Sequence, residues 1–226
     1  VQKSSFTRPS QNLMKQSVVL VLVFVSLVAC QERSHIITGV PYYRQITDYA
    51  CGAASLQMVL DYYAINSSQF VQQETVMDVA RTSESDGTMT PDTTRAGRFS
   101  AMSSANGIAF PSFTVTGGYP GRPIGLAAFE HLASAPWMDD LKDLIDRDLP
   151  VIVLSKYALD DGGGHYRVVI GYDDNFGKIY LQDPWGRSPD SRQVVDFTYS
   201  DWIYLWNYTE VGRSNPFFGA VLMPWN

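Results

Sequence analysis

The sequence predicts an α+β protein in which helices come first and an antiparallel sheet follows. The chain has 226 residues, of which 45% are hydrophobic and 13% aromatic, so it can bury a sizeable core without disulfides or metals. Helical spacing of apolar residues dominates up to about residue 147, and short β-branched and aromatic segments follow from residue 151. No internal repeat is visible, so one domain with an N-terminal appendage is expected.

The first helix is expected over Cys51–Tyr63. Ala54, Met58 and Tyr62 recur at i, i+4 and i+8, which gives a broad apolar face suited to a core-facing helix. An extended segment, Val40–Gln45, leads into this helix. Further helical patterns are expected at residues 69–81, 91–105 and 137–147.

Start and stop signals support these later helices. Thr90 is expected to cap the pattern that begins at Pro91, and the last pattern carries acids early and Arg147 late, as the helix dipole favours. Turn-rich residues predict loops at Ser83–Thr93 and Gly117–Pro123.

The sheet is predicted from short runs rich in β-branched and aromatic residues. Gly, Pro, Asn and Asp separate these runs, a pattern typical of antiparallel strands. The five runs are Val151–Leu154, His165–Tyr172, Lys178–Gln182, Gln193–Phe197 and Phe217–Met223.

Composition excludes several classes of function. The chain has 17 Lys and Arg against 23 Asp and Glu and a sequence pI near 4.9, which disfavours a nucleic-acid partner. Two cysteines cannot make a disulfide scaffold, and no Cys/His cluster has zinc spacing. We therefore expect no metal and no cofactor.

The N-terminal appendage has the pattern of a secretory signal peptide. Val18–Ala29 is a run of twelve uncharged residues, too short to span a bilayer, and basic residues precede it. Its end, Leu27-Val28-Ala29-Cys30, resembles the lipobox of bacterial lipoproteins, in which the cysteine is lipidated and becomes the new N-terminus. The alternative is an ordinary signal peptide or a short anchor.

This resemblance implies three parts: residues 1–29 as a lipoprotein-type signal peptide, residues 30–39 as the lipidated Cys30 with a tether, and residues 40–226 as an exported domain. Loss of the three leader cations changes the net charge from −6 to −9, so acyl chains rather than a basic patch would hold the domain to the bacterial cell membrane or outer membrane. The domain would lie outside the cytoplasm. Cys51 would then be its lone free thiol.

Cys51 is a candidate nucleophile. It begins the predicted helix, where the helix dipole and unpaired amide groups stabilise a thiolate. Gln45, six residues earlier, could supply a side-chain donor that forms an oxyanion hole with a backbone N–H of the first turn. The alternative is that Cys51 is a small core residue and Gln45 an ordinary polar one.

His165 and Asp183 are candidate partners for this thiol. His165 follows three glycines at the start of one predicted strand, and Asp183 follows the end of the next. If the two strands form a hairpin through residues 173–177, both side chains lie at the same end of it. The carboxylate would then orient the imidazole and stabilise its charged form.

Three motifs together resemble the papain-fold cysteine peptidases related to the bacteriocin-leader (double-glycine) peptidases. They are VPYYRQ with CGAASLQMVL, GHYRVVIGYDD, and LQDPWG. The resemblance covers about residues 40–223. It implies a papain-like fold whose nucleophile helix packs on the C-terminal sheet.

The same resemblance implies roles for four residues. Cys51 would be the nucleophile, His165 the general base and then acid, Asp183 the residue that orients His165, and Gln45 the oxyanion donor. The expected activity is cleavage of a peptide or amide bond, in a peptide or protein substrate, through an acyl-thioester.

Other functions remain open on the sequence alone. The same residues could pass the acyl group to an amine, as acyltransferase and transglutaminase-like relatives do. A catalytically silent lipoprotein that binds peptides is the non-enzyme alternative. Cell-wall amidases of the same superfamily are a further possibility, although their usual Asp-Cys-Ser-Gly motif is absent here. Aromatic residues near the strands, among them Trp185, Trp202 and Trp206, could line a substrate cleft or belong to the core.

Overall fold

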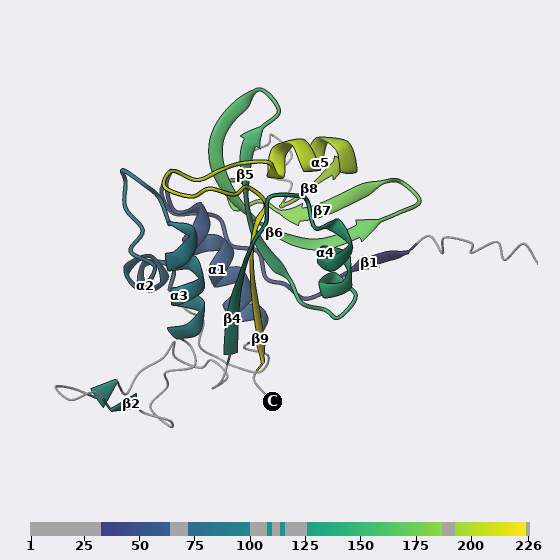
Figure 1. The fold of residues 1–226 in the computed structure, drawn as a ribbon. Coiled ribbons are helices and arrows are strands. Elements are labelled where there is room, and N and C mark those ends of the chain that lie inside the picture. Colours follow the sequence, from purple (N-terminus) through teal and green to yellow (C-terminus); the bar gives the residue numbers. More distant parts are fainter. Residues whose placement is uncertain are drawn as a thin grey trace, which may run out of the picture. The chain divides into compact units, whose positions relative to one another are not determined.

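The computed structural model describes residues 33–63, 72–99, 108–109, 114–115, 126–186 and 193–224. Contacts divide the chain into two units, Val1–Gln31 and Glu32–Asn226. The expected signal peptide and Cys30 lie outside the described residues. The predicted loop Gly117–Pro123 and the ends of two predicted helices lie outside them as well. The fold given below is that of the second unit (Figure 1).

Five helices are described in this unit. They are α1 (Cys51–Tyr62), α2 (Gln73–Val79), α3 (Thr90–Phe99), α4 (Met138–Ile145) and α5 (Tyr199–Trp206). None of them is both long and apolar enough to cross a membrane.

The described strands form one main antiparallel sheet and a two-stranded ribbon. In the main sheet the order is β4-β9-β5-β6-β7-β8, and β1 pairs with β6 outside this path. The strands are β1 (Ser34–Ile36), β4 (Leu126–Leu132), β5 (Val151–Ala158), β6 (Asp161–Asp173), β7 (Lys178–Gln182), β8 (Val194–Thr198) and β9 (Phe218–Pro224), and the ribbon pairs β2 (Ile108–Ala109) with β3 (Thr114–Val115). The predicted α+β class and the antiparallel sheet are therefore confirmed.

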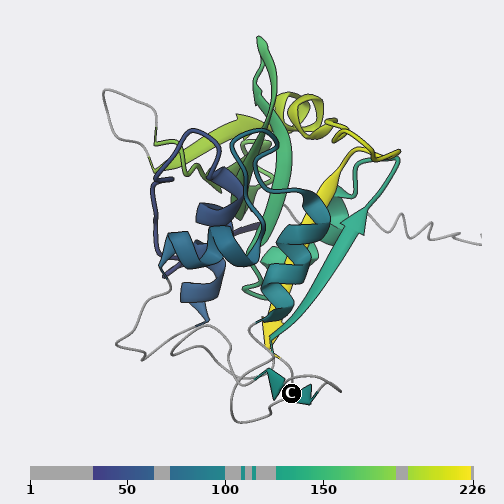
Figure 2. The same ribbon diagram turned by 90° about the vertical axis from the view of Figure 1, so that its left-hand side faces the viewer.

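Helices cover both sides of the main sheet. Figures 1 and 2 show α1, α2 and α3 on one side and α4 and α5 on the other. Helix α1 is buried along its whole length from Cys51 to Asp61, because α2, α3 and β6 all contact it. Its sequence predicts one apolar face, and the surrounding elements bury the other faces too.

Strand β6 carries His165, the predicted partner of Cys51, and its pairing with the neighbouring strands positions this residue. It pairs with β5 on one side, from Val151 opposite Val169 to Ala158 opposite Asp161, and with β7 on the other. The hairpin that the sequence predicts through residues 173–177 is present, and β7 has the predicted bounds. Strands β5 and β6 are both longer than the predicted strands, since β5 continues to Ala158 and β6 begins four residues before His165.

Strand β1 falls within the stretch that the sequence predicts as a tether. Ser34–Ile36 pair with residues 173–171 of β6, on the side of β6 that β5 leaves open. A β-carbon at Gly171 would lie 2.8 Å from the His35 carbonyl oxygen, so a glycine is needed where β1 crosses. These three residues are therefore part of the folded sheet, and the expectation of a tether over residues 30–39 is wrong for them.

Two further elements have no counterpart among those that the sequence predicts. Leu126–Leu132 is strand β4, paired along its length with β9, and Tyr199–Trp206 is helix α5. Trp202 and Trp206 of α5 are fully buried, so they belong to the core and not to a substrate cleft. Trp206 stacks on Trp202 and also lies against Trp137.

Candidate active site

Cys51 is the first residue of α1, as predicted. Its side chain is almost buried, with 9% of the residue exposed. The first amide groups of a helix have no partner within it, and the backbone N–H groups of Gly52 and Tyr166 lie close enough to the Cys51 sulfur to lower its pKa. These donors favour a negative charge on the sulfur.

His165 lies on β6, directly opposite Ser155 of β5. Its Nε2 is 2.7 Å from Oδ1 of Asp183, and its side chain lies close enough to Cys51 for each group to shift the pKa of the other. Because Nε2 is engaged by the carboxylate, Nδ1 is the ring nitrogen that can exchange a proton with the thiol. The structure thus brings three of the predicted site residues together.

The structure explains why one of the three residues before His165, Gly164, is a glycine. A β-carbon at this position would lie 2.7 Å from the hydroxyl oxygen of Tyr208, which is closer than side chains pack. Tyr208 therefore covers the backbone beside the imidazole. A residue with a side chain would push it away.

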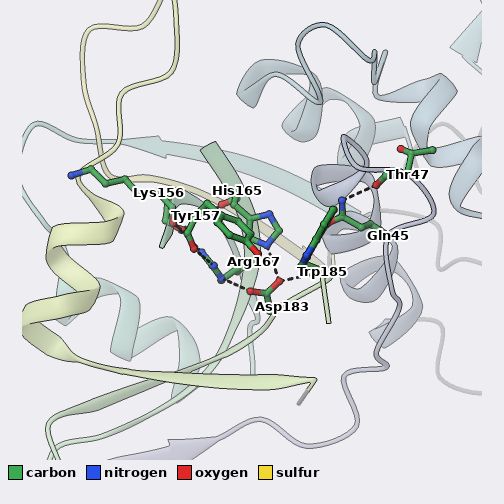
Figure 3. Close-up of polar contacts among 9 residues, drawn as sticks. Gln45, Thr47, Lys156, Tyr157, His165, Arg167, Asp183 and Trp185 are labelled. Atoms are coloured by element: carbon green, nitrogen blue, oxygen red, sulfur yellow. Dashed lines mark hydrogen bonds and ion pairs between the residues drawn. The ribbon is translucent and has the colours of Figure 1, made fainter. Parts of the chain in front are cut away.

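Asp183 follows β7 and accepts three hydrogen bonds, as Figure 3 shows. Its Oδ1 faces His165 and also accepts from the backbone N–H of Trp185 at 2.9 Å. Its Oδ2 accepts from Nε of Arg167 at 2.8 Å. Burial alone would raise the pKa of this carboxyl, but His165, Arg167 and the Trp185 N–H hold it well below its usual range.

Arg167 is the site residue that sequence reasoning missed. It lies two positions after His165 on β6, with only 3% of the residue exposed. Besides Asp183, its guanidinium donates to Oγ of Ser155 and to the carbonyl oxygens of Lys156 and Tyr157. The sequence did carry one signal for its role. Arg167 lies two positions after His165 in a predicted strand, and residues i and i+2 of a strand point to the same side.

The protonation states of Cys51 and His165 shift in opposite directions. Burial opposes a thiolate, but the hydrogen bond and charge of His165 outweigh it and lower the pKa of Cys51. Burial likewise opposes an imidazolium, but the hydrogen bonds of Asp183 and Cys51 outweigh both burial and the nearby Arg167 charge, and they raise the pKa of His165. The pair is therefore biased towards thiolate and imidazolium, the form that attacks a carbonyl carbon.

Gln45 lies beside the loop that carries Asp183. Its backbone N–H donates to the carbonyl of Pro184 at 2.9 Å, and its side chain is buried. The side-chain Nε2 donates one hydrogen to the carbonyl of Thr47 at 2.7 Å (Figure 3), which leaves its second hydrogen for another acceptor. Gln73 of α2 fixes this segment by bonding the backbone of Arg44 and Ile46.

Two cavities flank Cys51, and both are also lined by Asp48 and Gly164. The first, of about 410 Å³, lies between the start of α1, residues 85–89 and residues 208–211. The second, of about 210 Å³, is lined by His165, Tyr157 and Trp185 among others. Both cavities reach the thiol, so together they offer space for a substrate.

Two aromatic rings line the second cavity together with the imidazole. The Tyr157 ring meets His165 edge-on, with centroids 5.2 Å apart, and also meets Trp185 at 6.4 Å. Trp185, which the sequence left open between cleft and core, thus lines the cleft. Such rings keep water from the imidazole and its hydrogen bonds.

The remaining histidines lie elsewhere. His35 is on β1, where its Nε2 is 2.8 Å from Oδ1 of Asp148, and His131 is on β4 beside Trp137. Within the described ranges, no group of three or more His, Cys, Asp or Glu residues is arranged to hold a metal ion.

The chain is similar to a known family of peptidases. The model of the Peptidase_C39-like family matches residues 37–211. No curated protein matches the chain.

Solved structures with the same fold share little sequence with the chain. A double-glycine-motif protease of an AMS/PCAT transporter, in complex with its leader peptide, has 20% identity and a TM-score of 0.50, and the match covers 86% of this chain and 100% of that one. The peptidase domain of Streptococcus ComA, a bifunctional ABC transporter, has 17% identity and a TM-score of 0.52, over 83% and 100%. Xylellain, a cysteine protease from Xylella fastidiosa, has 15% identity and a TM-score of 0.57, over 85% and 86%. The chain belongs to the peptidase C39-like family.

Proposed function

We propose that the protein is a cysteine peptidase that cleaves a peptide or amide bond through an acyl-thioester on Cys51. The observation that carries this proposal is the placement of His165, whose imidazole lowers the pKa of Cys51 and whose Nε2 is 2.7 Å from Oδ1 of Asp183. The family match and the papain-like fold of the neighbours support it.

The proposed reaction proceeds in two steps. The Cys51 thiolate attacks the carbonyl carbon and forms a C–S bond, and the C–N bond breaks as His165 protonates the leaving amine. In the second step His165 takes a proton from water, whose oxygen attacks the thioester, and the thiolate leaves. Asp183 keeps the imidazole oriented and stabilises its charged form in both steps.

The oxyanion of each tetrahedral intermediate needs donors. We assign this role to Gln45 Nε2 and to a backbone N–H in the first turn of α1. One Nε2 hydrogen is held by Thr47, which fixes the plane of the amide. The second hydrogen is then available for the oxyanion.

We propose a peptide or protein as the substrate. A structural neighbour was solved in complex with the leader peptide, and the two cavities that Cys51 lines give room for a chain that continues past the cleaved bond.

The pH dependence of Cys51 alkylation tests the thiolate–imidazolium pair. In the full chain, mass spectrometry of iodoacetamide-treated protein separates the Cys51 peptide from the Cys30 peptide. We expect Cys51 to react with a pKa below the ordinary value of about 8.5, and His165→Ala to raise that pKa, because burial then acts without the imidazolium.

His35→Ala is the matched control, since His35 lies on β1 and its Nε2 contacts Oδ1 of Asp148 rather than the site. It should leave the Cys51 curve unchanged. A wild-type curve at about 8.5 that His165→Ala does not move would contradict the proposal and favour a silent peptide-binding protein.

We further propose that Cys30 is lipidated and holds an exported domain at the cell envelope. The support is the apolar run Val18–Ala29 directly before this cysteine. Labelling of expressing bacteria with a clickable fatty acid should mark the wild type and Cys51→Ser but not Cys30→Ser. Label that persists in Cys30→Ser would contradict lipidation at this residue.

A further inference from the structure

The larger cavity beside Cys51 combines apolar walls with carboxylates. Leu154, Met89, Tyr166 and Tyr208 supply apolar surface, and the acidic residues Asp48, Asp86 and Glu210 line the same space. Among the described residues that line it, none is Lys, Arg or His. A long side chain with an apolar stem and a cationic end matches such a space.

Glu210 is the carboxylate that the fold fixes most firmly. Its side chain is 10% exposed, and its two oxygens accept hydrogen bonds from the backbone N–H and from Oγ1 of Thr90, at 3.0 and 2.7 Å. These bonds fix the carboxylate at the start of α3, where the helix dipole favours a negative charge.

Arg213 reduces the charge near Glu210 without cancelling it. Its Nε is 3.7 Å from Glu210, whereas its Nη2 lies 2.8 and 3.0 Å from the two oxygens of Glu130. One cation thus serves two carboxylates, and the group of three keeps a net negative charge.

Asp86 stands at the rim of the same cavity. Its carboxylate accepts hydrogen bonds from the hydroxyl groups of Ser83 and Ser85, which hold it in the loop that packs on α1. Asp86 is exposed, so it adds to the negative potential that a cationic side chain meets on entry.

The position of the imidazole tells which part of the substrate this cavity receives. His165 lines the smaller cavity and not the larger one. In the proposed reaction His165 protonates the leaving amine, so the leaving group lies in the smaller cavity. The larger cavity then receives the acyl part, which stays on Cys51.

We propose that the larger cavity binds the Lys or Arg side chain of one of the two substrate residues that precede the cleaved bond. This inference rests on the proposed peptidase function and names its substrate class. The stem packs on Leu154, Tyr166 and Tyr208, and the cationic end reaches Glu210.

Reactive peptides test this subsite without a known substrate. The probes are tripeptidyl acyloxymethyl ketones with Arg, norleucine or Glu at the first or the second position before the reactive carbonyl, and Gly at the other. The measurement is the rate of labelling of Cys51 in the full chain, read by mass spectrometry. At one of the two positions we expect Arg to label about tenfold faster than norleucine, and Glu more slowly than both.

Glu210→Gln should lower the Arg-to-norleucine ratio, because the amide removes the negative charge but keeps an acceptor for Thr90. Glu74→Gln, an exposed position on α2, is the matched control and should keep the ratio. If Glu210→Gln fails to fold, Asp86→Asn on the exposed loop and added salt should both lower the ratio.

The outcomes separate the two proposals. If no probe labels Cys51 faster in the wild type than in His165→Ala, the peptidase proposal and the subsite proposal fail together. If labelling depends on His165 but Arg and norleucine react equally at both positions, the subsite proposal alone is overturned.

Discussion

His165 and Arg167 reach the two oxygens of one carboxylate because they lie two residues apart on β6. Asp183 receives the imidazole on Oδ1 and the guanidinium on Oδ2. The carboxylate therefore cannot rotate without losing one of them. Arg167 acts as a positioning residue, since its contacts run through Asp183 and the end of β5 rather than to the thiol.

Arg167 also affects the charge of the imidazole. Its cation counteracts the rise in the pKa of His165, so Arg167→Gln should move that pKa further upwards. The expected result is a basic limb of the pH–rate profile for Cys51-dependent cleavage that lies at higher pH than in the wild type. Arg167→Lys should restore part of the wild-type profile.

A purely structural role for Arg167 makes a different prediction. Loss of its buried hydrogen bonds would then lower the amount of folded protein, and the basic limb would stay where it is. Thermal unfolding measured beside the pH profile separates the two effects, because a lower melting temperature alone leaves the profile in place.

The thiol, imidazole and carboxylate were predictable from sequence because each stands at a recognisable boundary. Cys51 begins a helical pattern, and His165 and Asp183 stand at the two open ends of a hairpin whose turn is rich in Asp, Asn and Gly. Arg167 was not predictable in the same way, since an arginine on a strand usually lies in solvent. Its burial depends on Ser155, Lys156 and Tyr157 of β5, and this pairing appears only in the folded sheet.

At the scale of elements, the start of α1 is held in place by the loop between α2 and α3. A β-carbon at Gly52 would lie 2.6 Å from Cβ of Thr88. Thr88 lines the larger cavity, and its hydroxyl is hydrogen-bonded to that of Thr82 at 2.7 Å. Because Gly52 has no side chain, Thr88 in the cavity wall can lie close to the start of α1, next to the nucleophile.

Gly52→Ala should therefore reduce both stability and activity. The added methyl group forces the Thr88 loop outwards at a cost of about 1–3 kcal/mol, which the better helix propensity of alanine offsets only in part. Urea unfolding and the rate of Cys51 alkylation measure the two effects.

Gly162→Ala is the matched control for this substitution. Nothing lies within 4 Å of a β-carbon at Gly162, so stability and alkylation should stay close to wild type. Equal effects of the two substitutions would contradict the role given to the Thr88 contact.

Helix α5 and strand β4 show where local sequence misleads. The α5 sequence, YSDWIYLW, is rich in residues that favour strands, yet it forms a helix whose start is capped by Thr198, which accepts from the Asp201 N–H at 3.2 Å. Strand β4 has the sequence LAAFEHL, made largely of helix-forming residues. Its pairing with β9 along seven positions overrides that preference.

At the scale of the molecule, Asp174 joins three elements in the turn after β6. Its carboxylate accepts from Nζ of Lys142 on α4, from the hydroxyl group of Tyr199 on α5, and from the backbone N–H of Arg33 beside β1. Burial opposes the charge, but these donors lower the pKa of Asp174 below its ordinary value.

The direction of this shift predicts how acid affects stability. A carboxyl whose pKa is lowered by folding stabilises the fold above its unfolded pKa of about 3.9, and this contribution is lost as the pH falls towards the folded pKa. Asp174→Asn should therefore lower the free energy of unfolding by about 1 kcal/mol at pH 7, since solvent screens part of the interaction. At pH 3 the difference between variant and wild type should be smaller.

Urea unfolding at the two pH values measures this difference. Asp160→Asn, at the exposed tip of the β5–β6 hairpin, is the control and should match the wild type at both. If Asp174→Asn lowers the free energy of unfolding as much at pH 3 as at pH 7, the loss comes from the changed side-chain group and not from the charge.

The fold class and the family could be predicted from the sequence because three motifs in order span the domain. The full extent of the sheet, including strand β1, could not be predicted from the sequence. Strand β1 has only three paired residues, too few for a period of two to be visible. Its place depends on Gly171, whose lack of a side chain matters only once β1 crosses it.

Strand β1 also determines where the chain can be shortened. Residues 171–173 of β6 pair with β7 on one side and with β1 on the other, because β5 begins only at the partner of Val169. A chain that starts at Val40 would leave these backbone groups bare along an open strand edge. Such an edge is a template for pairing with a second molecule, so a fragment cut there would be prone to aggregation, whereas one that starts at Glu32 would keep the edge covered.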